Sequence, residues 1–243
     1  MEPVEEDRAL LEIEQLSVGY RSLAVLDNLS LSVHKQRIVA VVGPNGAGKT
    51  TLLQAVGGLI RPVKGHIRYA GEPVEALPVR EIVRRGIIYV PEGMKVFPQM
   101  SVLENLEIGG YLNRNRIKAS LELIFELFPE LRDRRQDRAG ILSGGQQRMV
   151  TLGRGLMAEA RLLLLDDPFI GLSPKFVKRF CGTFRNLRKS GMTLFIAGQH
   201  VRRILNVADI AFLIEDGTIT LSGPGPGILH NYHLQKVLFG TEM

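Results

Sequence analysis

The sequence predicts an α/β fold with a mostly parallel sheet core, a small antiparallel β subdomain and a helical subdomain. Three observations lead to this prediction. Short apolar runs without polar alternation recur along the chain, which is typical of strands buried on both faces of a parallel sheet. Other segments alternate apolar and polar residues, as half-buried antiparallel strands do. One long central stretch has apolar residues at three- and four-residue spacing, which indicates helices.

In the first half of the chain, antiparallel strands are expected where apolar and polar residues alternate, at residues 10–17, 29–33 and 66–69. Residues 38–42 and 87–90 are apolar throughout, so we expect buried parallel strands there. A helix is expected after the first of these, from Thr51. The stretch 101–131 is expected to be helical because apolar residues recur at helical spacing before Pro129, namely Leu121, Ile124, Phe125 and Phe128.

In the second half, an apolar helix is expected at residues 149–157, followed by three buried strands at 162–165, 194–197 and 211–214. Residues 175–189 carry an apolar stripe at helical spacing and no acidic residue. This pattern predicts an amphipathic helix that rests on the sheet and exposes a basic face to solvent.

The chain length of 243 residues suits one elaborated domain. We expect a single domain over residues 1–243. Approximately residues 1–91 and 156–243 would form the core with the antiparallel subdomain, and 92–155 would form the helical subdomain.

The composition excludes several classes of protein. With 45% hydrophobic and 23% charged residues, the chain is neither disordered nor fibrous. Its one cysteine, Cys181, excludes an internal disulfide and is expected to be a small buried apolar residue. The uncharged stretch 217–235 contains too much Gly and Pro for a spanning helix, and the acidic N-terminus is unlike a signal peptide. We therefore expect a cytoplasmic protein.

A phosphate-binding loop follows the first buried strand. Residues 43–50 fit the pattern G-x-x-x-x-G-K-[ST] at every fixed position, between an expected strand and an expected helix. Backbone N–H groups of such a loop surround the phosphates of a nucleotide, the lysine adds a positive charge, and the hydroxyl ligates Mg²⁺. The expected contacts with ATP are made by Gly43, Pro44, Asn45, Gly46, Ala47, Gly48, Lys49, Thr50 and Thr51.

A pair of acidic residues closes the apolar run at 162–165. Asp166 is expected to hold Mg²⁺ directly or through water, together with Thr50. Asp167 would then orient or deprotonate the water that attacks the γ-phosphate. In a chain without the phosphate loop, such a pair would suggest only a helix cap or a solvated turn.

A Ser-Gly-Gly turn before the helix at 149–157 offers a second anion site of backbone donors, at Ser143, Gly144, Gly145 and Gln146. With the phosphate loop and the paired acids, this turn makes the chain resemble the ATP-binding cassette (ABC) family over nearly its entire length. The resemblance implies a P-loop NTPase fold of ABC type. It also implies a head-to-tail dimer, in which the Ser-Gly-Gly signature of one subunit closes over the ATP held by its partner.

The resemblance also assigns three further positions. Tyr20 matches the aromatic residue on which adenine stacks, with a core tyrosine as the alternative. Glu92 occupies the position of a glutamine that senses the γ-phosphate and Mg²⁺ in most cassettes, so it is a nucleotide and metal contact. Gln199 occupies the position of the usual switch histidine and is expected to join Lys49 and Asp167 as a catalytic residue. The adjacent His200 remains an alternative for that switch.

Departures from the common pattern narrow the function. Glu92, Gln199, Glu-Leu-Phe-Pro-Glu-Leu at 126–131 and Gly-Leu-Ser-Pro at 171–174 resemble the ATPase subunits of branched-chain amino acid importers. Asp-Pro-Phe at 167–169 and His-Val-Arg at 200–202 resemble lipopolysaccharide-export cassettes instead. Asp167 replaces the usual glutamate, which keeps open a slow ATPase or a weakly hydrolysing regulatory subunit.

The expected cofactors are ATP and Mg²⁺, and the expected partners are a second cassette subunit and integral membrane permease subunits. An importer would add a periplasmic solute-binding protein. No nucleic-acid partner is expected, because the basic helix lacks stacking aromatics and the chain has no room for the long coiled-coil insertion or second cassette of repair ATPases. The apolar loop 94–100 either is buried or forms a groove for a short cytoplasmic helix of a permease, which would hold the chain at the inner face of the membrane.

Overall fold

The computed structural model describes residues 9–20 and 23–240. A six-stranded sheet has the order β10-β9-β3-β8-β7-β6, and a four-stranded antiparallel sheet has the order β2-β1-β4-β5. The strands of the larger sheet are β3 (Ile38–Val42), β6 (Ile87–Val90), β7 (Leu162–Asp166), β8 (Thr193–Ala197), β9 (Ile210–Glu215) and β10 (Thr218–Pro224). Those of the smaller sheet are β1 (Ala9–Tyr20), β2 (Leu23–His34), β4 (Lys64–Tyr69) and β5 (Glu72–Pro73).

Ten α-helices surround the sheets in the described part of the chain. They are α1 (Lys49–Val56), α2 (Val79–Arg84), α3 (Val102–Gly109), α4 (Ile117–Leu127), α5 (Pro129–Asp133), α6 (Gly144–Leu156), α7 (Pro174–Lys189), α8 (Val201–Leu205), α9 (Gly225–Ile228) and α10 (Tyr232–Phe239). Two 3₁₀ turns, Arg114–Arg116 and Ala139–Ile141, lie between them. None of the described helices is long and apolar enough to cross a bilayer.

The larger sheet is buried on both faces because alternate residues of its strands enter two separate cores. In β3, Val39 and Val41 pack into the core formed with the antiparallel sheet and α1, whereas Ile38, Ala40 and Val42 pack into the core formed with the helices of the other face. All five side chains are fully buried. The unbroken apolar runs in the sequence are the direct consequence of this double burial.

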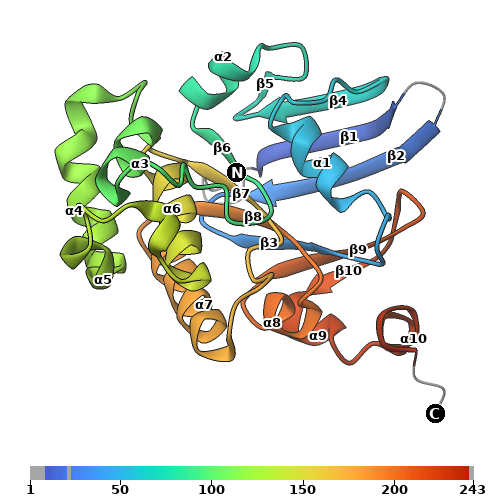
Figure 1. Ribbon diagram of the computed structural model, residues 1–243. Helices are drawn as coiled ribbons and strands as arrows, with labels where there is room; N and C mark the ends of the chain where they lie inside the picture. The colour runs from blue at the N-terminus through green and yellow to red at the C-terminus, as the bar shows by residue number, and fades with distance from the viewer. Residues whose placement is uncertain (1–8, 21–22, 241–243) are drawn as a thin grey trace, which may run out of the picture.

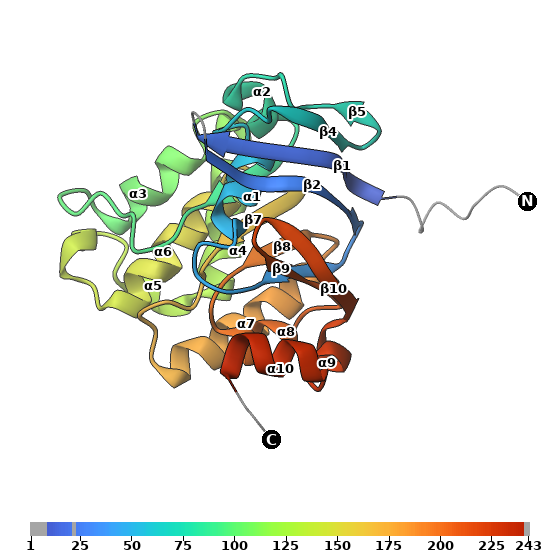
Figure 2. The same ribbon diagram turned by 90° about the vertical axis from the view of Figure 1, so that its right-hand side faces the viewer.

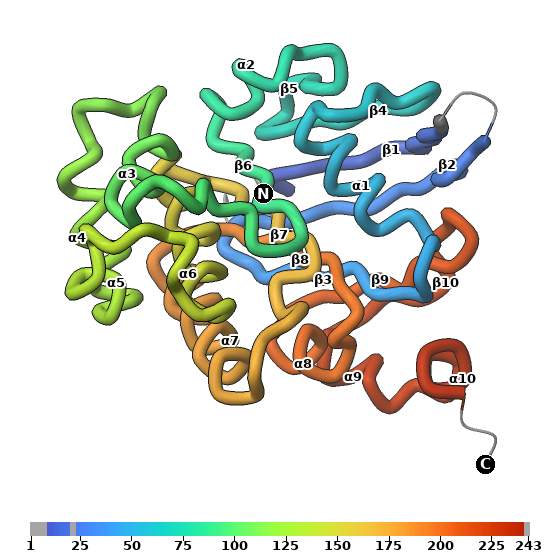
Figure 3. The backbone as a smooth tube through the Cα atoms, in the orientation of Figure 1, coloured from blue at the N-terminus to red at the C-terminus, as the bar shows by residue number. Residues whose placement is uncertain are grey.

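The layers are visible in two orientations. The antiparallel sheet lies over one face of the molecule, with α1 near it, and helices α7 to α10 lie on the opposite side of the larger sheet (Figure 2). Helices α3 to α6 gather at one end (Figure 1). The backbone leaves the larger sheet after β6, runs through α3, α4 and α5, and returns through α6 to β7 (Figure 3).

The five predicted parallel strands are confirmed, each within one residue at either end. They pair in parallel as β6-β7-β8-β3-β9. The three antiparallel segments also pair as expected, although β1 and β2 extend beyond the predicted ranges. The sequence analysis gives no strand at β10, whose alternate residues are exposed at the antiparallel edge of the sheet.

Two helices carry their expected faces. In α7 the stripe of Val177, Phe180, Phe184 and Leu187 is buried, as its spacing predicts, and Cys181 is buried beside it. Helix α6 begins five residues earlier than the predicted 149–157. The earlier start follows from a capping box, in which the Ser143 side chain accepts from the backbone of Gln146 and the Gln146 side chain accepts from the backbone of Ser143.

Parallel pairing places the carboxyl ends of β3, β8, β7 and β6 side by side at one edge of the sheet. The phosphate loop follows β3, Asp166 and Asp167 close β7, Gln199 follows β8, and Glu92 follows β6. In an open α/β sheet this edge is where ligands bind. The predicted site residues that follow these four strands therefore meet there.

Candidate nucleotide-binding site

The loop between β3 and α1 is shaped by glycines. Gly48 caps α1 with a φ of 101°, in the left-handed region, and a Cβ there would lie 2.5 Å from Leu26 Cδ2. Only glycine fits this position without displacing Leu26. The first turn of α1 contains no acidic residue, so its N–H groups and helix dipole favour an anion.

Lys49 is the buried cation of this loop. Its side chain is only 7% exposed, and its Nζ donates to the carbonyl oxygens of Gly43 at 2.8 Å and Pro44 at 2.7 Å. Burial lowers the pKa of the Lys49 ammonium from its usual value, and the charges of Asp167 and Asp166 oppose this effect. The loop thus folds around its own lysine and holds a positive charge next to the two carboxylates.

Asp166 is held by two hydroxyl groups. Its Oδ1 accepts from Thr50 Oγ1 at 3.1 Å and its Oδ2 accepts from Tyr89 OH at 2.9 Å. Burial raises the pKa of the Asp166 carboxyl from its usual value, while the two hydroxyl bonds oppose this effect. Thr50 and Asp166 bring two hard oxygen donors together, which fits Mg²⁺, an ion that takes its other ligands from phosphates and water.

Asp167 adopts a left-handed backbone conformation, with a φ of 40°. Its N–H donates to the Ala197 carbonyl at 2.8 Å, and its Oδ1 accepts from the Gln199 N–H at 2.7 Å. The intervening Gly198 approaches closely, since a Cβ there would lie 2.8 Å from Asp167 Oδ1. The carboxylate of Asp167 is therefore fixed by the loop that follows β8, through the backbone of Gln199 and not its exposed side chain.

Arg148 joins three segments of the site, a role that the sequence analysis misses. This α6 side chain is 2% exposed, and its guanidinium donates to five backbone oxygens, those of Pro91, Gly93, Asp166, Asp167 and Pro168. It thus ties the two ends of the Glu92 turn to the end of β7. The available signal was a charged residue directly before the buried Met149 and Val150.

Glu92 itself is exposed on this turn. Its charge nevertheless acts on the neighbouring groups, because it raises the pKa of both Asp166 and Tyr89 from their usual values as one of several causes, burial being the largest. The carboxylate is thus close to the Thr50–Asp166 pair without bonding to it.

The signature turn lies at the start of α6. Ser143 Oγ accepts from the Gln146 N–H at 3.4 Å, and Gln146 Oε1 accepts from Ser143 N and from Arg134 Nη1, both at 3.1 Å. Gly145 must be glycine because a Cβ would lie 2.6 Å from the Phe176 ring. The turn is rigid and presents backbone donors at a helix N-terminus.

Three predicted residues are not brought into this cluster. Within the described residues, no hydrogen bond joins the signature turn to the phosphate loop. Tyr20 ends β1, and its side chain lies outside what the structure describes. His200, the alternative switch residue, begins α8 and meets the Phe169 ring edge-on at a centroid distance of 6.1 Å, so it faces away from the carboxylates.

Known proteins share both the sequence and the fold. A family profile described as "ABC transporter" matches residues 26–170. The high-affinity branched-chain amino acid transport ATP-binding protein BraG of Pseudomonas aeruginosa is 37% identical over 232 residues, which cover 95% of this chain and 100% of that protein. The chain belongs to the ABC transporter family. It is a cassette ATPase, as the resemblance of its motifs indicates.

Two other similarities bear on this cassette. The lipopolysaccharide export system ATP-binding protein LptB of Haemophilus influenzae is 32% identical over 238 residues, covering 96% of this cassette and 98% of that protein. A solved structure of a nucleotide-free ATP-binding cassette from an ABC transporter shares the fold, with a TM-score of 0.86 and 24% identity over 96% of this cassette and all of that chain. Cassettes of this family bind and hydrolyse ATP, and work as dimers with membrane permeases.

Proposed function

We propose that the chain is the ATP-hydrolysing subunit of an importer for branched-chain amino acids or related small polar solutes. The observation that carries this proposal is the 37% identity to BraG over nearly the whole of both chains. Glu92, Gln199 and the stretch 171–174 support the same assignment by resemblance. Lipopolysaccharide export is the second candidate, supported by the 32% identity to LptB and by the segments 167–169 and 200–202.

In the proposed reaction, the phosphate loop binds the β- and γ-phosphates of ATP through its N–H groups and Lys49. Thr50 and Asp166 hold Mg²⁺, which would neutralise charge that develops on the phosphates. Asp167 orients the attacking water, and Gln199 fixes the Asp167 carboxylate through its N–H. Ser143 and the glycines after it contact the nucleotide of the other subunit. Tyr20 stacks on the adenine.

The proposed assembly follows from this division of labour. Two cassettes close over two ATP molecules, and the closing motion reaches permease subunits through the surface near Glu92. The loop after Glu92 supports this role because Met94 and Phe97 are 45% and 47% exposed, which excludes the buried alternative for these two side chains. The helices 92–155 form the moving helical subdomain. We place the cassette at the cytoplasmic face of a membrane, with a periplasmic solute-binding protein as a further partner.

Purification from native membranes tests this function. A tagged chain should retain integral membrane subunits encoded in the same organism, and ATP hydrolysis by the complex in vesicles should rise with the transported solute. Accumulation of leucine, isoleucine or valine would support import. Extraction of lipopolysaccharide would select the alternative, and a chain without membrane subunits would overturn the proposal.

The length of Asp167 is expected to limit turnover. Its carboxylate is one methylene shorter than the glutamate of most cassettes, and a displacement of about 1 Å can cost about a hundredfold in rate. Asp167→Glu should raise kcat by about tenfold to a hundredfold with little change in ATP affinity. Asp167→Asn keeps the size and the tolerance for a left-handed backbone, so it should bind ATP, remain dimeric and hydrolyse little.

Phosphate release and size-exclusion chromatography in ATP measure these outcomes. If Asp167→Glu is no faster and Asp167→Asn is as active as the wild type, the water is oriented by another group.

Gly144→Asp should stop turnover while the monomer still binds ATP. The new carboxylate stands at the first residue of α6, where it keeps the Ser143 cap but repels the phosphates of the partner's nucleotide. Gly144→Ala is the matched control, because it places the same Cβ about 3.1 Å from the flexible Met94 side chain without charge. Titration calorimetry and turnover of mixed dimers provide the measurement. Loss of ATP binding by the monomeric Gly144→Asp chain would contradict action in trans.

A further inference from the structure

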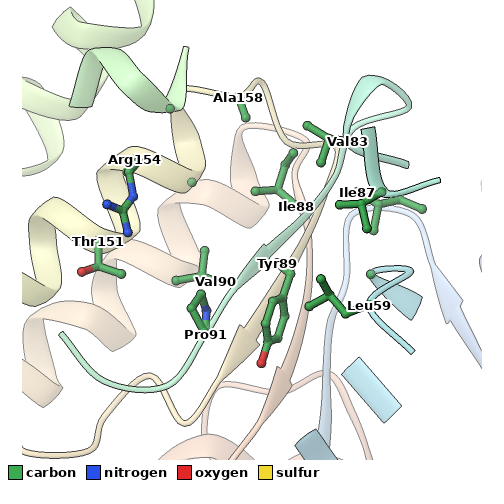
Figure 4. A pocket seen from close by; sticks show the side chains of 14 residues that line it. Leu59, Val83, Ile87, Ile88, Tyr89, Val90, Pro91, Thr151, Arg154 and Ala158 are labelled. Atoms are coloured by element: carbon green, nitrogen blue, oxygen red, sulfur yellow. The ribbon is translucent and has the colours of Figure 1, made fainter. Parts of the chain in front are cut away.

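A cavity of about 270 Å³ lies between α6 and the segment that joins α1, α2 and β6. Thr151 and Arg154 line it from α6, the strand β6 runs along its floor, and Leu59 and Val83 close the other side (Figure 4). Its lining is mainly apolar, and Leu59 and Val79 at its rim are 51% and 40% exposed. The cavity suits a few side chains of a partner and is too small for a nucleotide.

Arg154 is a cation without an anion in this apolar lining. Its Nη2 donates to the Lys95 carbonyl, and its guanidinium lies under the Phe97 ring, 5.1 Å from the centroid. Its Nη1 is buried and has no hydrogen-bond partner. Across the described ranges 9–20 and 23–240, no carboxylate lies within ion-pair distance of Arg154.

Two other arginines show how unusual this is. Arg148, six residues earlier on α6, donates to five carbonyl oxygens, and the charges of Asp166, Asp167 and Glu92 raise its pKa against the effect of burial. Arg132 lies over the Phe125 ring as Arg154 lies over Phe97, yet it pairs with Glu122 at 2.7 Å. For Arg154 the pKa is lowered by burial with no opposing charge.

A buried guanidinium that lacks an acceptor is costly, and an incoming carboxylate removes that cost. We propose that the cavity receives a short helix of a permease subunit, whose apolar face packs on Leu59, Val79 and Val83 and whose Asp or Glu side chain accepts from Arg154 Nη1. This inference rests on the proposed transport function and adds the chemistry of the partner. Phe97, exposed in the loop after β6, covers the guanidinium and must move aside as the carboxylate enters.

The apolar rim and the single cation together select this occupant. A phosphate-rich surface would need several cations, whereas Arg154 is the one charged residue among the described residues that line the cavity. A wholly apolar helix would leave Nη1 unsatisfied. One carboxylate on an apolar helix satisfies both features of the lining.

The test uses the permease subunits that co-purify with the wild-type chain. Arg154→Gln should weaken the affinity of the full-length chain for these detergent-solubilised subunits by about 30-fold or more, the low end of the effect of truncating one partner of a buried charge pair. Arg132→Gln is the matched control, because Arg132 also lies over a phenylalanine but already has Glu122. It should bind the permease as the wild type does.

The acidic partner is located by cross-linking. Leu59→Cys, labelled with a benzophenone maleimide while Cys181 stays buried, should cross-link to a short helical permease segment that carries an Asp or Glu. Changing that residue to Arg should reduce binding, and combining it with Arg154→Glu should restore it. The permease substitution leaves this chain intact, so it decides the matter even where an Arg154 variant does not fold.

The outcomes separate the two proposals. Wild-type affinity of Arg154→Gln, or a cross-linked segment without an acidic residue, overturns the carboxylate while the transport function stands. Loss of binding to phosphatidylglycerol vesicles by Arg154→Gln in the absence of permease would make a lipid the occupant and overturn the helix. A wild-type chain that holds no membrane subunit overturns both.

Discussion

Lys49→Ala is expected to abolish ATP hydrolysis and to weaken ATP binding at least about a hundredfold. The ammonium is the one buried cation of the loop between β3 and α1, within the described residues, and it faces Asp166 and Asp167. Without it, the two carboxylates would repel the γ-phosphate with no positive charge between them. Titration calorimetry with ATP and Mg²⁺ and steady-state phosphate release measure the two effects.

The control for Lys49 is Lys189→Ala at the solvent-facing end of α7. It also removes one positive charge from the chain, and nucleotide affinity should not change. A thermal melt of each variant shows whether Lys49→Ala folds, since its Nζ also bonds to Gly43 and Pro44 in the loop. Unchanged ATP affinity and turnover in Lys49→Ala would remove the assignment of the phosphate loop.

Arg148→Met is expected to destabilise the chain by about 3–5 kcal/mol. Methionine fills part of the space but leaves five carbonyl oxygens at the ends of β6 and β7 without their donor. For a chain of this size, that loss lowers the Tm by roughly 6–20 °C. Scanning calorimetry provides the measurement, with Arg132→Met as the control, because its guanidinium is half exposed and makes a surface ion pair.

Loss of Arg148 should also reduce turnover in the molecules that remain folded, because the Glu92 turn and the Asp167 backbone lose their common anchor. A Tm close to that of the wild type would show that the five carbonyls find other donors, and that Arg148 does not hold the site together.

The parallel core was predictable because double burial removes polar residues from its strands. The runs at β3 and β7 contain no polar residue before Asp166, so their type and bounds follow from the sequence alone. The strand β10 was not predicted, because Thr218 and the alternating exposed residues after it lie at a sheet edge and carry only a weak apolar signal. The early start of α6 was missed because glycines at 144 and 145 obscure a helix that the Ser143–Gln146 cap begins.

The site was predictable where chemistry fixes residue types. The contact of Thr50 with Asp166 was expected from the motifs, since both residues follow neighbouring elements at the same edge of the sheet. Tyr89 and Arg148 were not predicted, because their roles depend on distances between segments that are remote in sequence. A buried arginine reads in the sequence like any arginine on a helix, and only the fold shows that it meets five carbonyls.

Tyr89 gives the molecule a short internal distance. Its hydroxyl bonds to Asp166 at 2.9 Å, and the same side chain lines the cavity between α6 and β6. One phenol ring therefore spans the thickness of protein between the acidic end of β7 and the proposed seat of the permease helix. A change in load on Asp166 needs no relay of successive contacts to reach that seat, because the two ends of a single rigid ring lie in both places.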